Sequence, residues 1–376
     1  MDKTFLYRFL SGCFRAFPLR KRTILFVSYY GAQYGCNPKY LSECFARKYP
    51  AWTMVWGFTD PKAHSAVPAR KVRYLSLRFL FELATCKVFV TNFRMPFFFK
   101  RRAGQFYVQT WHSSLRLKAI EADAEATISP AYVQMAKHDS LQISLLLSGC
   151  KISTDIFRRA FWYDGEILPS GTPRMDLLFS ENPEKRRRLK QKLGLPESIN
   201  IALYAPTFRE NKTGNPYNLD LAVLLNGLQA RWGGEWIILL RLHPHMRNDS
   251  PILVPSSVPI LDVSTYDDIQ ELLYVSDVVI SDYSSLIFDF ALTGRPCFLY
   301  TPDLDDYLEK ERRLYFDPKD LPFPLIRNNE ELTTVLKGFN ENDYRSHLED
   351  FLQRIGSYET GNACELVCQA IMNRIT

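Results

Sequence analysis

The sequence predicts an α/β protein with parallel sheets in two doubly wound domains. Short runs rich in Val, Ile, Leu and Phe alternate with longer helical stretches, which is typical of buried parallel strands joined by helices. The chain has 376 residues, a length that suits two domains of about 150–200 residues better than one core. Hydrophobic residues make up 46% and aromatic residues 14% of the chain, so we expect a globular protein.

The expected strands are short apolar runs bounded by turn residues. They cover residues 23–28, 53–57, 87–91 and 106–111 in the first half, and residues 200–205, 236–241, 258–261, 278–281 and 296–300 in the second half. A turn-rich segment at 170–174, followed by a charged helix over 181–192, indicates a domain junction. We therefore expect an N-terminal domain over 23–172 and a C-terminal domain over 173–376, whose last helix packs back on the N-terminal domain.

Composition excludes several classes of protein. The net charge is +6, which fits phosphorylated substrates, an anionic membrane or nucleic acid. The 47 basic residues are interleaved with 41 acidic ones, which disfavours a non-catalytic polymer binder, and no nucleic-acid partner is expected. The eight cysteines form neither a CxxC pair nor a Cys/His zinc pattern, so we expect thiols in a reducing cytoplasm. The chain also lacks GxxxxGK[ST] and GxGxxG motifs, which disfavours a P-loop kinase or a conventional dinucleotide enzyme.

Two segments have the composition of a membrane-surface contact. Residues 1–22 place apolar side chains at helical spacing among arginines, a pattern unlike a signal peptide. They are expected either to lie at a membrane interface or to pack as a helix on their own domain. Residues 96–102 set three phenylalanines beside three cations and admit bilayer contact or a buried strand end. No run of about 18 apolar residues occurs, so no transmembrane helix is expected.

The most informative segment is DVVISDYSSLIFDF at 277–290. A predicted strand ends in Asp282 and Tyr283, and the adjacent Ser284 and Ser285 precede an apolar helical stretch. The first N–H groups of a helix lack intrahelical partners and favour an anion, so this turn is predicted to bind phosphate. A plain N-cap role for Ser284 is the alternative. Asp289, one turn later, is expected to bond a ribose hydroxyl or to pair locally.

Polar residues also follow two other predicted strands of the second half. Thr207 and Arg209 come after the strand at 200–205, where a guanidinium is well placed to hold a phosphate. Arg241 and His243 come at the end of the strand at 236–241. A surface arginine and a structural histidine are the alternatives at these positions.

The first half of the chain shows the same pattern. Trp111, His112 and Ser113 come at the end of the strand at 106–111, and a histidine there can act as a base near neutral pH. Lys118, Glu121 and Asp123 follow within about three helical turns, so a carboxylate that orients the base is expected nearby. The loop GAQYGCNPKY at 31–40, which contains Gln33 and Asn37, follows the strand at 23–28 as either a ligand loop or a plain turn.

With these motifs the chain resembles the CDP-glycerol glycerophosphotransferases of teichoic-acid and capsule synthesis. The matching segments are GAQYGCNPKY at 31–40, TWHSSLRLK at 110–118, GTPRMD at 171–176, LYAPTFRE at 203–210, RLHP at 241–244 and ISDYSSLIFDF at 280–290. They occur in the family's order and cover most of residues 25–320. Many members have a glycine after the first histidine, where Ser113 and Ser114 stand here, so this chain is expected to differ in its donor or acceptor.

The resemblance implies a GT-B architecture, in which two Rossmann-like domains with parallel sheets face a central cleft. It implies transfer of an alditol phosphate, most directly glycerol phosphate, from a CDP-linked donor to a hydroxyl of a lipid-linked saccharide or polymer, with release of CMP. The N-terminal domain would bind the acceptor and the C-terminal domain the donor, at the inner face of the cytoplasmic membrane. Glycerol against ribitol, and primase against polymerase, stay open.

We assign site residues on this basis. The catalytic pair is His112, as the base, and His243, which stabilises charge at the diphosphate. The residues expected to bind the donor are Thr207, Arg209, Arg241, Asp282, Tyr283, Ser284, Ser285 and Asp289. The residues expected to bind the acceptor are Gln33, Asn37, Trp111, Ser113, Lys118 and Glu121. No cofactor is expected, although a loosely held Mg²⁺ stays compatible with the sequence. The alternative is a GT-B glycosyltransferase that uses a nucleotide sugar.

Overall fold

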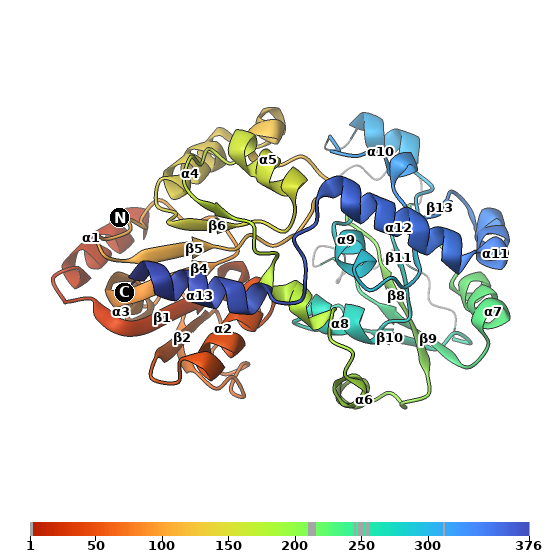
Figure 1. Ribbon diagram of the computed structural model, residues 1–376, viewed down its shortest axis with the longest axis horizontal. Helices are drawn as coiled ribbons and strands as arrows, with labels where there is room; N and C mark the ends of the chain where they lie inside the picture. Colours follow the sequence, from red (N-terminus) through yellow and green to blue (C-terminus); the bar gives the residue numbers. More distant parts are fainter. Residues whose placement is uncertain are drawn as a thin grey trace. The chain divides into compact units, whose positions relative to one another are not determined.

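The computed structural model describes residues 3–209, 216–243, 246, 252, 256–310 and 313–375. Two residues of the matched segments, Glu210 and Pro244, lie outside this part of the chain. The chain forms two compact units (Figure 1). Unit 1 comprises residues 1–114, 120–176 and 357–376, and unit 2 comprises residues 115–119 and 177–356.

Unit 1 is built on a seven-stranded parallel sheet of order β3-β2-β1-β4-β5-β6-β7. Its strands are β1 (Arg20–Val27), β2 (Thr53–Phe58), β3 (Arg70–Arg73), β4 (Cys86–Thr91), β5 (Phe106–Gln109), β6 (Leu145–Leu147) and β7 (Ile167–Leu168). Its helices are α1 (Lys3–Phe14), α2 (Cys36–Lys48), α3 (Leu77–Thr85), α4 (Pro130–Ser140), α5 (Lys151–Ala160) and α13 (Ala363–Ile375). The central strands are buried on both faces, as Leu25 and Phe89 in register on β1 and β4 illustrate, because helices cover a parallel sheet on both sides.

Unit 2 is built on a six-stranded parallel sheet of order β10-β9-β8-β11-β12-β13. Its strands are β8 (Asn200–Ala205), β9 (Trp236–Leu240), β10 (Ile260–Asp262), β11 (Val278–Ser281), β12 (Cys297–Tyr300) and β13 (Leu325–Ile326). Its helices are α6 (Pro183–Lys192), α7 (Leu221–Trp232), α8 (Ile269–Val275), α9 (Leu286–Ala291), α10 (Leu304–Lys310), α11 (Asn329–Gly338) and α12 (Glu341–Ile355).

These two parallel sheets confirm the predicted fold class, α/β of the GT-B type with two Rossmann-like domains. The boundary expected at residues 172/173 lies at the start of the 3-10 turn Pro173–Leu177, and unit 1 continues to Asp176. The division is also less simple than expected, because residues 115–119 belong to unit 2 and residues 357–376 belong to unit 1. The residues expected as a separate N-terminal segment belong to unit 1, where β1 begins at Arg20.

The N-terminal helix α1 has two different faces. Tyr7, Leu10 and Phe14 pack against the core of unit 1, whereas Phe5 and Phe9 are each 61% exposed. The helix is therefore packed on its own unit and still presents aromatic surface. The loop at 96–102 differs from the bilayer contact considered for it, because Phe98 and Phe99 are buried in the core. No helix in the described stretches is long and apolar enough to cross a bilayer.

The C-terminal segment returns to unit 1 and is held there by two carboxylates. Asp176 accepts hydrogen bonds from the backbone N–H groups of Ala363 (2.9 Å) and Cys364 (2.7 Å) at the start of α13. Glu359 accepts from the backbone N and the hydroxyl of Thr172. Figure 1 shows the blue helix α13 among the red and orange elements of this unit, where it packs on α2.

Replacing this helix cap tests how α13 is held. Asp176→Ala is expected to lower the free energy of unfolding by about 1–2 kcal/mol, because two N–H groups at the start of α13 lose their acceptor. Asp155→Ala is the matched control, since the Asp155 side chain is 52% exposed and pairs only with Lys151, which predicts a change of about 0–0.5 kcal/mol. Urea unfolding followed by circular dichroism measures both, and equal effects would contradict the capping role.

Candidate functional site

The site in unit 1 lies where three neighbouring strands end. β1, β4 and β5 are adjacent and parallel, so the loops that follow them meet at one edge of the sheet. These loops begin at Ser28, Asn92 and Thr110. In open parallel sheets this edge is where ligands bind.

The turn after β5 has a left-handed residue at its centre. Trp111 has φ +51°, a conformation that costs a bulky side chain about 1–2 kcal/mol. Three hydrogen bonds hold it. The side-chain amide of the fully buried Asn37 donates to the carbonyl oxygens of Thr110 and Trp111, both at 3.1 Å, and the Trp111 N–H donates to Oε1 of Gln109 at 3.0 Å. The strain is therefore maintained by buried polar groups from α2 and β5.

This turn presents His112. Its ring stacks on the Trp111 ring, with centroids 4.4 Å apart and planes 29° apart. Nδ1 lies 3.0 Å from the backbone oxygen of Asn92. Because a carbonyl oxygen can only accept, Nδ1 carries the proton in the neutral ring, and Nε2 is then the basic nitrogen. The geometry thus provides a half-buried imidazole in the tautomer that a general base needs.

Asn92 connects the three loops and was missed by the sequence analysis. Its side chain is fully buried: Oδ1 accepts from the Tyr29 N–H at 2.9 Å, and Nδ2 donates to the Ser28 hydroxyl at 3.3 Å. The Tyr29 and Tyr30 backbones are also left-handed, with φ of +43° and +57°. Asn92 directly follows the predicted strand at 87–91, so the rule that singled out His112 could have found it.

Most residues predicted to bind the acceptor prove to be buried. Asn37 is fully buried, and Trp111 and Ser113 are each 5% exposed. They build and support the turn, which replaces the predicted contact with a ligand. Gln33 is half-buried in the loop between β1 and α2 and is the one residue of this set in unit 1 whose position suits a ligand contact.

Glu121 belongs to a buried ion cluster and does not orient His112. Its carboxylate lies 3.1 Å from Nη2 of Arg94 and accepts from the Tyr132 hydroxyl at 2.8 Å. Arg94 also pairs with Asp139 at 3.3 Å, and its guanidinium lies 5.9 Å from the Trp111 ring. Burial raises the pKa of Asp139 to about 6, although the Arg94 charge opposes the shift. Asn92, through its backbone carbonyl, takes the orienting role that a carboxylate was expected to play.

Lys118 lies in unit 2 and not, as predicted, with the acceptor-binding residues of unit 1. Its segment forms an antiparallel bridge to Leu314, and Nζ lies 5.4 Å from the centre of the Tyr307 ring. The preceding Leu117 N–H donates to the Ser285 hydroxyl at 3.3 Å. A lysine is thereby held within unit 2 close in sequence to a contact with the predicted phosphate turn.

Unit 2 has its own buried charge cluster, centred on Arg209. Its five guanidinium N–H groups all find acceptors: the carboxylates of Asp282 and Asp303, and both oxygens of Thr207. The closest carboxylate contacts are 2.9 Å to Asp282 and 2.7 Å to Asp303. Burial lowers the pKa of Arg209, but the two carboxylates outweigh this effect and raise it, so the side chain stays charged.

This cluster corrects several of the predicted donor contacts. Arg209 is 2% exposed, Asp282 3% and Tyr283 1%, so none of them offers its polar group to a ligand in this structure. Asp282 also accepts from the Thr207 N–H at 3.0 Å, and Tyr283 stacks on Tyr307 with ring centres 3.5 Å apart. They tie together the loops after β8, β11 and β12. Asp303, which follows β12, was missed although it also stands just beyond a predicted strand.

Two further donor candidates are held inside unit 2. Asp289 is 1% exposed and accepts from the Gln270 amide at 2.7 Å, which agrees with local pairing and not with a ribose contact. Nη1 of Arg241 donates to the carbonyl oxygens of Val263 (3.1 Å) and Tyr266 (2.7 Å). Arg241 therefore supports the loop after β10.

Three predicted residues of unit 2 stay accessible. Ser284 and Ser285 are half-buried at the start of α9. The Ser284 hydroxyl accepts from the Leu286 N–H at 3.4 Å, whereas Ser285 occupies the N-cap position without a side-chain cap bond. His243 is exposed, and its ring lies 5.8 Å from that of Phe208. Hydroxyls, helix N–H groups and an imidazole can all donate to a phosphate. The described part of the chain contains no group of three or more His, Cys, Asp or Glu side chains placed to hold a metal ion.

Comparison with known proteins identifies relatives over nearly the whole chain. The family model described as CDP-Glycerol:Poly(glycerophosphate) glycerophosphotransferase matches residues 10–373. The teichoic acid poly(glycerol phosphate) polymerase of Bacillus subtilis (strain 168) is 32% identical over 94% of this chain and 49% of that protein. The chain thus spans about half the length of that relative. A protein of the same name from Bacillus spizizenii (strain W23) is 30% identical over 98% of both chains.

A solved structure confirms the same relationship. The wall teichoic acid polymerase TagF matches with a TM-score of 0.84 and 29% identity over 98% of this chain and 93% of that chain. Another structure of TagF was obtained after a soak with CDPG.

The structural role found for Arg209 leads to a prediction about stability. Arg209→Met is expected to lower the free energy of unfolding by about 3–5 kcal/mol, because it leaves the buried carboxylates of Asp282 and Asp303 uncompensated. Arg327→Met is the matched control, since Arg327 pairs with the exposed Asp305, and its loss should cost about 0–1 kcal/mol. Thermal and urea unfolding measure both variants. A stable Arg209→Met protein that has lost only nucleotide affinity would restore the phosphate-binding role.

Proposed function

The chain belongs to the CDP-glycerol:poly(glycerophosphate) glycerophosphotransferase family, and from this premise we propose that it transfers glycerol phosphate from CDP-glycerol to a hydroxyl of a lipid-linked saccharide or polymer. CMP is the second product. The reaction would serve the synthesis of a teichoic-acid-type polymer. The observation that carries the proposal is the strained turn that presents His112 with Nδ1 against the Asn92 carbonyl.

His112 acts as the general base in this proposal. The acceptor oxygen attacks the phosphorus that bears the glycerol, its proton passes to Nε2 of His112, and the bond from that phosphorus to CMP breaks. Phosphoryl transfer depends on positioning and charge stabilisation more than on covalent help. A positioned base contributes about 10²–10⁴-fold to the rate. The hydrogen bond to Asn92 fixes the tautomer, so the ring needs no rearrangement before it accepts the proton.

Unit 2 supplies the groups for the donor. Ser284, Ser285 and the N–H groups at the start of α9 bind the diphosphate, and His243 stabilises the charge that develops on CMP. Lys118 adds a positive charge to this set, because its segment is bonded to Ser285 through the Leu117 N–H. Arg209 acts indirectly, by holding together the loops that carry these groups. No resident cofactor takes part, and a loosely bound Mg²⁺ is the alternative that chelation tests.

The protein works at the inner face of the cytoplasmic membrane. Support comes from α1, whose Phe5 and Phe9 stay exposed while its other apolar residues pack inward. Arginines and lysines lie on and after this helix, and an anionic leaflet attracts such a segment. A lipid-linked acceptor would be reached from this surface.

The reaction is tested by nucleotide release. CDP-glycerol, CDP-ribitol and UDP-N-acetylglucosamine are offered separately with a synthetic lipid-linked disaccharide, and with and without EDTA. We expect acceptor-dependent CMP release from CDP-glycerol that persists in EDTA. Release of UDP from the sugar nucleotide, with none from either CDP-alditol, would overturn the proposal and favour a glycosyltransferase.

Replacing the base separates catalysis from binding. His112→Gln is expected to lower kcat by about 10²–10⁴-fold and to leave the Kd for CDP-glycerol within about twofold, because the ring acts on the acceptor proton. His64→Gln is the control, since the His64 ring also stacks on an aromatic ring of unit 1, that of Phe58, away from the strand ends. A variant at 112 that keeps kcat but loses donor affinity would exclude the base assignment.

The serine pair is expected to act on donor affinity. Combined Ser284→Ala and Ser285→Ala should raise the Kd for CDP-glycerol by about tenfold or more, because each hydroxyl donates to a charged phosphate oxygen. Ser256→Ala with Ser257→Ala provides a matched control, since that adjacent pair is exposed elsewhere in unit 2. Calorimetric titration of both double variants decides the matter, and unchanged affinity at 284 and 285 would remove the phosphate site from this turn.

A further inference from the structure

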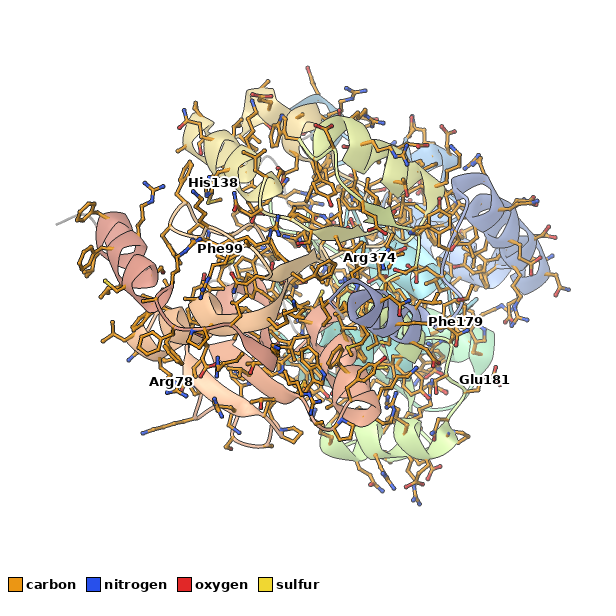
Figure 2. All side chains as sticks on the ribbon, turned by 60° about the vertical axis from the view of Figure 1, so that its left-hand side comes forward. Arg78, Phe99, His138, Phe179, Glu181 and Arg374 are labelled. Atoms are coloured by element: carbon orange, nitrogen blue, oxygen red, sulfur yellow. The ribbon has the colours of Figure 1, made fainter. Side chains whose placement is uncertain are left out.

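A cavity of about 420 Å³ lies between α1 and the loop 96–102 of unit 1. Arg8, Gly12 and Arg15 of α1 form one wall, and Phe98 and Phe99 form the opposite wall. His138 of α4 closes one side: its Nε2 lies 2.8 Å from the Phe99 carbonyl oxygen, and Figure 2 labels both residues on the same side of unit 1. Ligand-binding cavities have volumes of about 300–1,000 Å³, so this one has room for part of a small molecule.

The two walls are fixed to each other by specific contacts. Nη2 of Arg8 donates to the Phe97 carbonyl oxygen at 3.4 Å, and Nη1 of Arg15 donates to the Lys100 carbonyl oxygen at 3.1 Å. The Tyr7 and Phe98 rings pack with centroids 5.4 Å apart. Because α1 is bonded to the loop above and below the cavity, the space belongs to the packed structure.

The chemistry of the lining is that of an amphiphile site with one sign of charge. The interior is apolar, with Leu83 and the phenylalanines of the loop, and four cations line it: Arg8, Arg15, Lys100 and Arg102. None of the residues that line it, in the described part of the chain, is acidic. A guanidinium has five donors, so one hydrogen bond to a carbonyl oxygen leaves Arg8 and Arg15 able to bind a phosphate.

The surface around the cavity is aromatic. Phe5 and Phe9 are one helical turn apart on α1 and each 61% exposed, and Phe17 is 51% exposed. Exposed aromatics beside cations are typical of surfaces that enter the headgroup region of a bilayer. An occupant of the cavity would therefore come from a membrane.

The cavity lies at the opposite edge of the sheet from His112. Leu83 stands at the end of α3, just before β4 begins at Cys86, and the Gln105 amide fixes the loop there by donating to both carbonyl oxygens. His112 follows the edge where β4 and β5 end. The six residues of β4 separate the two edges by about 20 Å. A lipid in the cavity is accordingly not the acceptor that reacts at His112.

We propose that this cavity binds one anionic membrane lipid as an anchor, distinct from the acceptor lipid of the reaction. Its phosphate contacts the arginines and Lys100, and the first part of a chain enters between α1 and the phenylalanines. This inference deepens the membrane association proposed above and rests on it. Inorganic phosphate alone would satisfy the cations but not fill the apolar interior.

Gly12 allows a direct test. A Cβ at this position meets no atom within 4 Å, so a larger side chain can enter the cavity while every cation and every exposed phenylalanine stays in place. Binding of monomeric dihexanoyl phosphatidylglycerol is measured by calorimetry for the natural chain, Gly12→Ala and Gly12→Leu. We expect saturable binding, no change for alanine, and about tenfold weaker binding for leucine, since each excluded methylene costs roughly fourfold in affinity.

Three controls make the outcomes exclusive. Dihexanoyl phosphatidylcholine should bind more weakly than the anionic lipid, and inorganic phosphate should not displace it at equal concentration. Absence of binding, equal binding by Gly12→Leu and Gly12→Ala, equal binding of the neutral lipid, or displacement by phosphate would each overturn the proposal. Should Gly12→Leu fail to fold, Arg15→Gln replaces it and should weaken anionic-lipid binding severalfold. CMP release by the natural chain is measured in the same preparations, and its absence would bear on the transferase proposal and not on the lipid site.

Discussion

The left-handed backbone at Trp111 is the constraint on which the unit 1 site depends. Tryptophan does not adopt this conformation without compensation, and Asn37 and Gln109 provide it through hydrogen bonds from buried side chains. The resulting turn sets the His112 ring on the Trp111 ring and brings Nδ1 to the Asn92 carbonyl. One strained residue thus determines where the imidazole lies and which nitrogen is basic.

Unit 2 solves a similar problem with charge. The buried Arg209 binds carboxylates from the loops after β11 and β12 and the backbone of the loop after β8, so three loops at one sheet edge are held by a single guanidinium. Removing either sign of charge would leave the other buried, which is costly. In both units, fully buried polar residues position the loops, and the half-exposed histidine and serines are left to meet substrates. This division explains why so many polar residues near the site cannot themselves be ligands.

The sequence was informative about the fold because the central strands are continuous apolar runs. The segments at 200–205 and 278–281 match β8 and β11 residue for residue. β3, with the sequence RKVR, and β7 and β13, with two residues each, were missed, because edge strands are short and carry little apolar pattern. The rule that ligands meet strand ends located the right loops. It did not show which side chains point inward, because the partners that bury Arg209 and Glu121 come from Asp303 and Arg94, far away in the sequence.

The account depends most directly on the state of the His112 ring. Nitrogen-15 NMR of histidine-labelled protein reports which ring nitrogen carries the proton, and the His112 signals are identified by their absence from the His112→Gln spectrum. At a pH where the ring is neutral, we expect a protonated Nδ1 and an unprotonated Nε2, as the Asn92 contact requires. A neutral ring with the proton on Nε2 would contradict the account, because that nitrogen could not then take the acceptor proton.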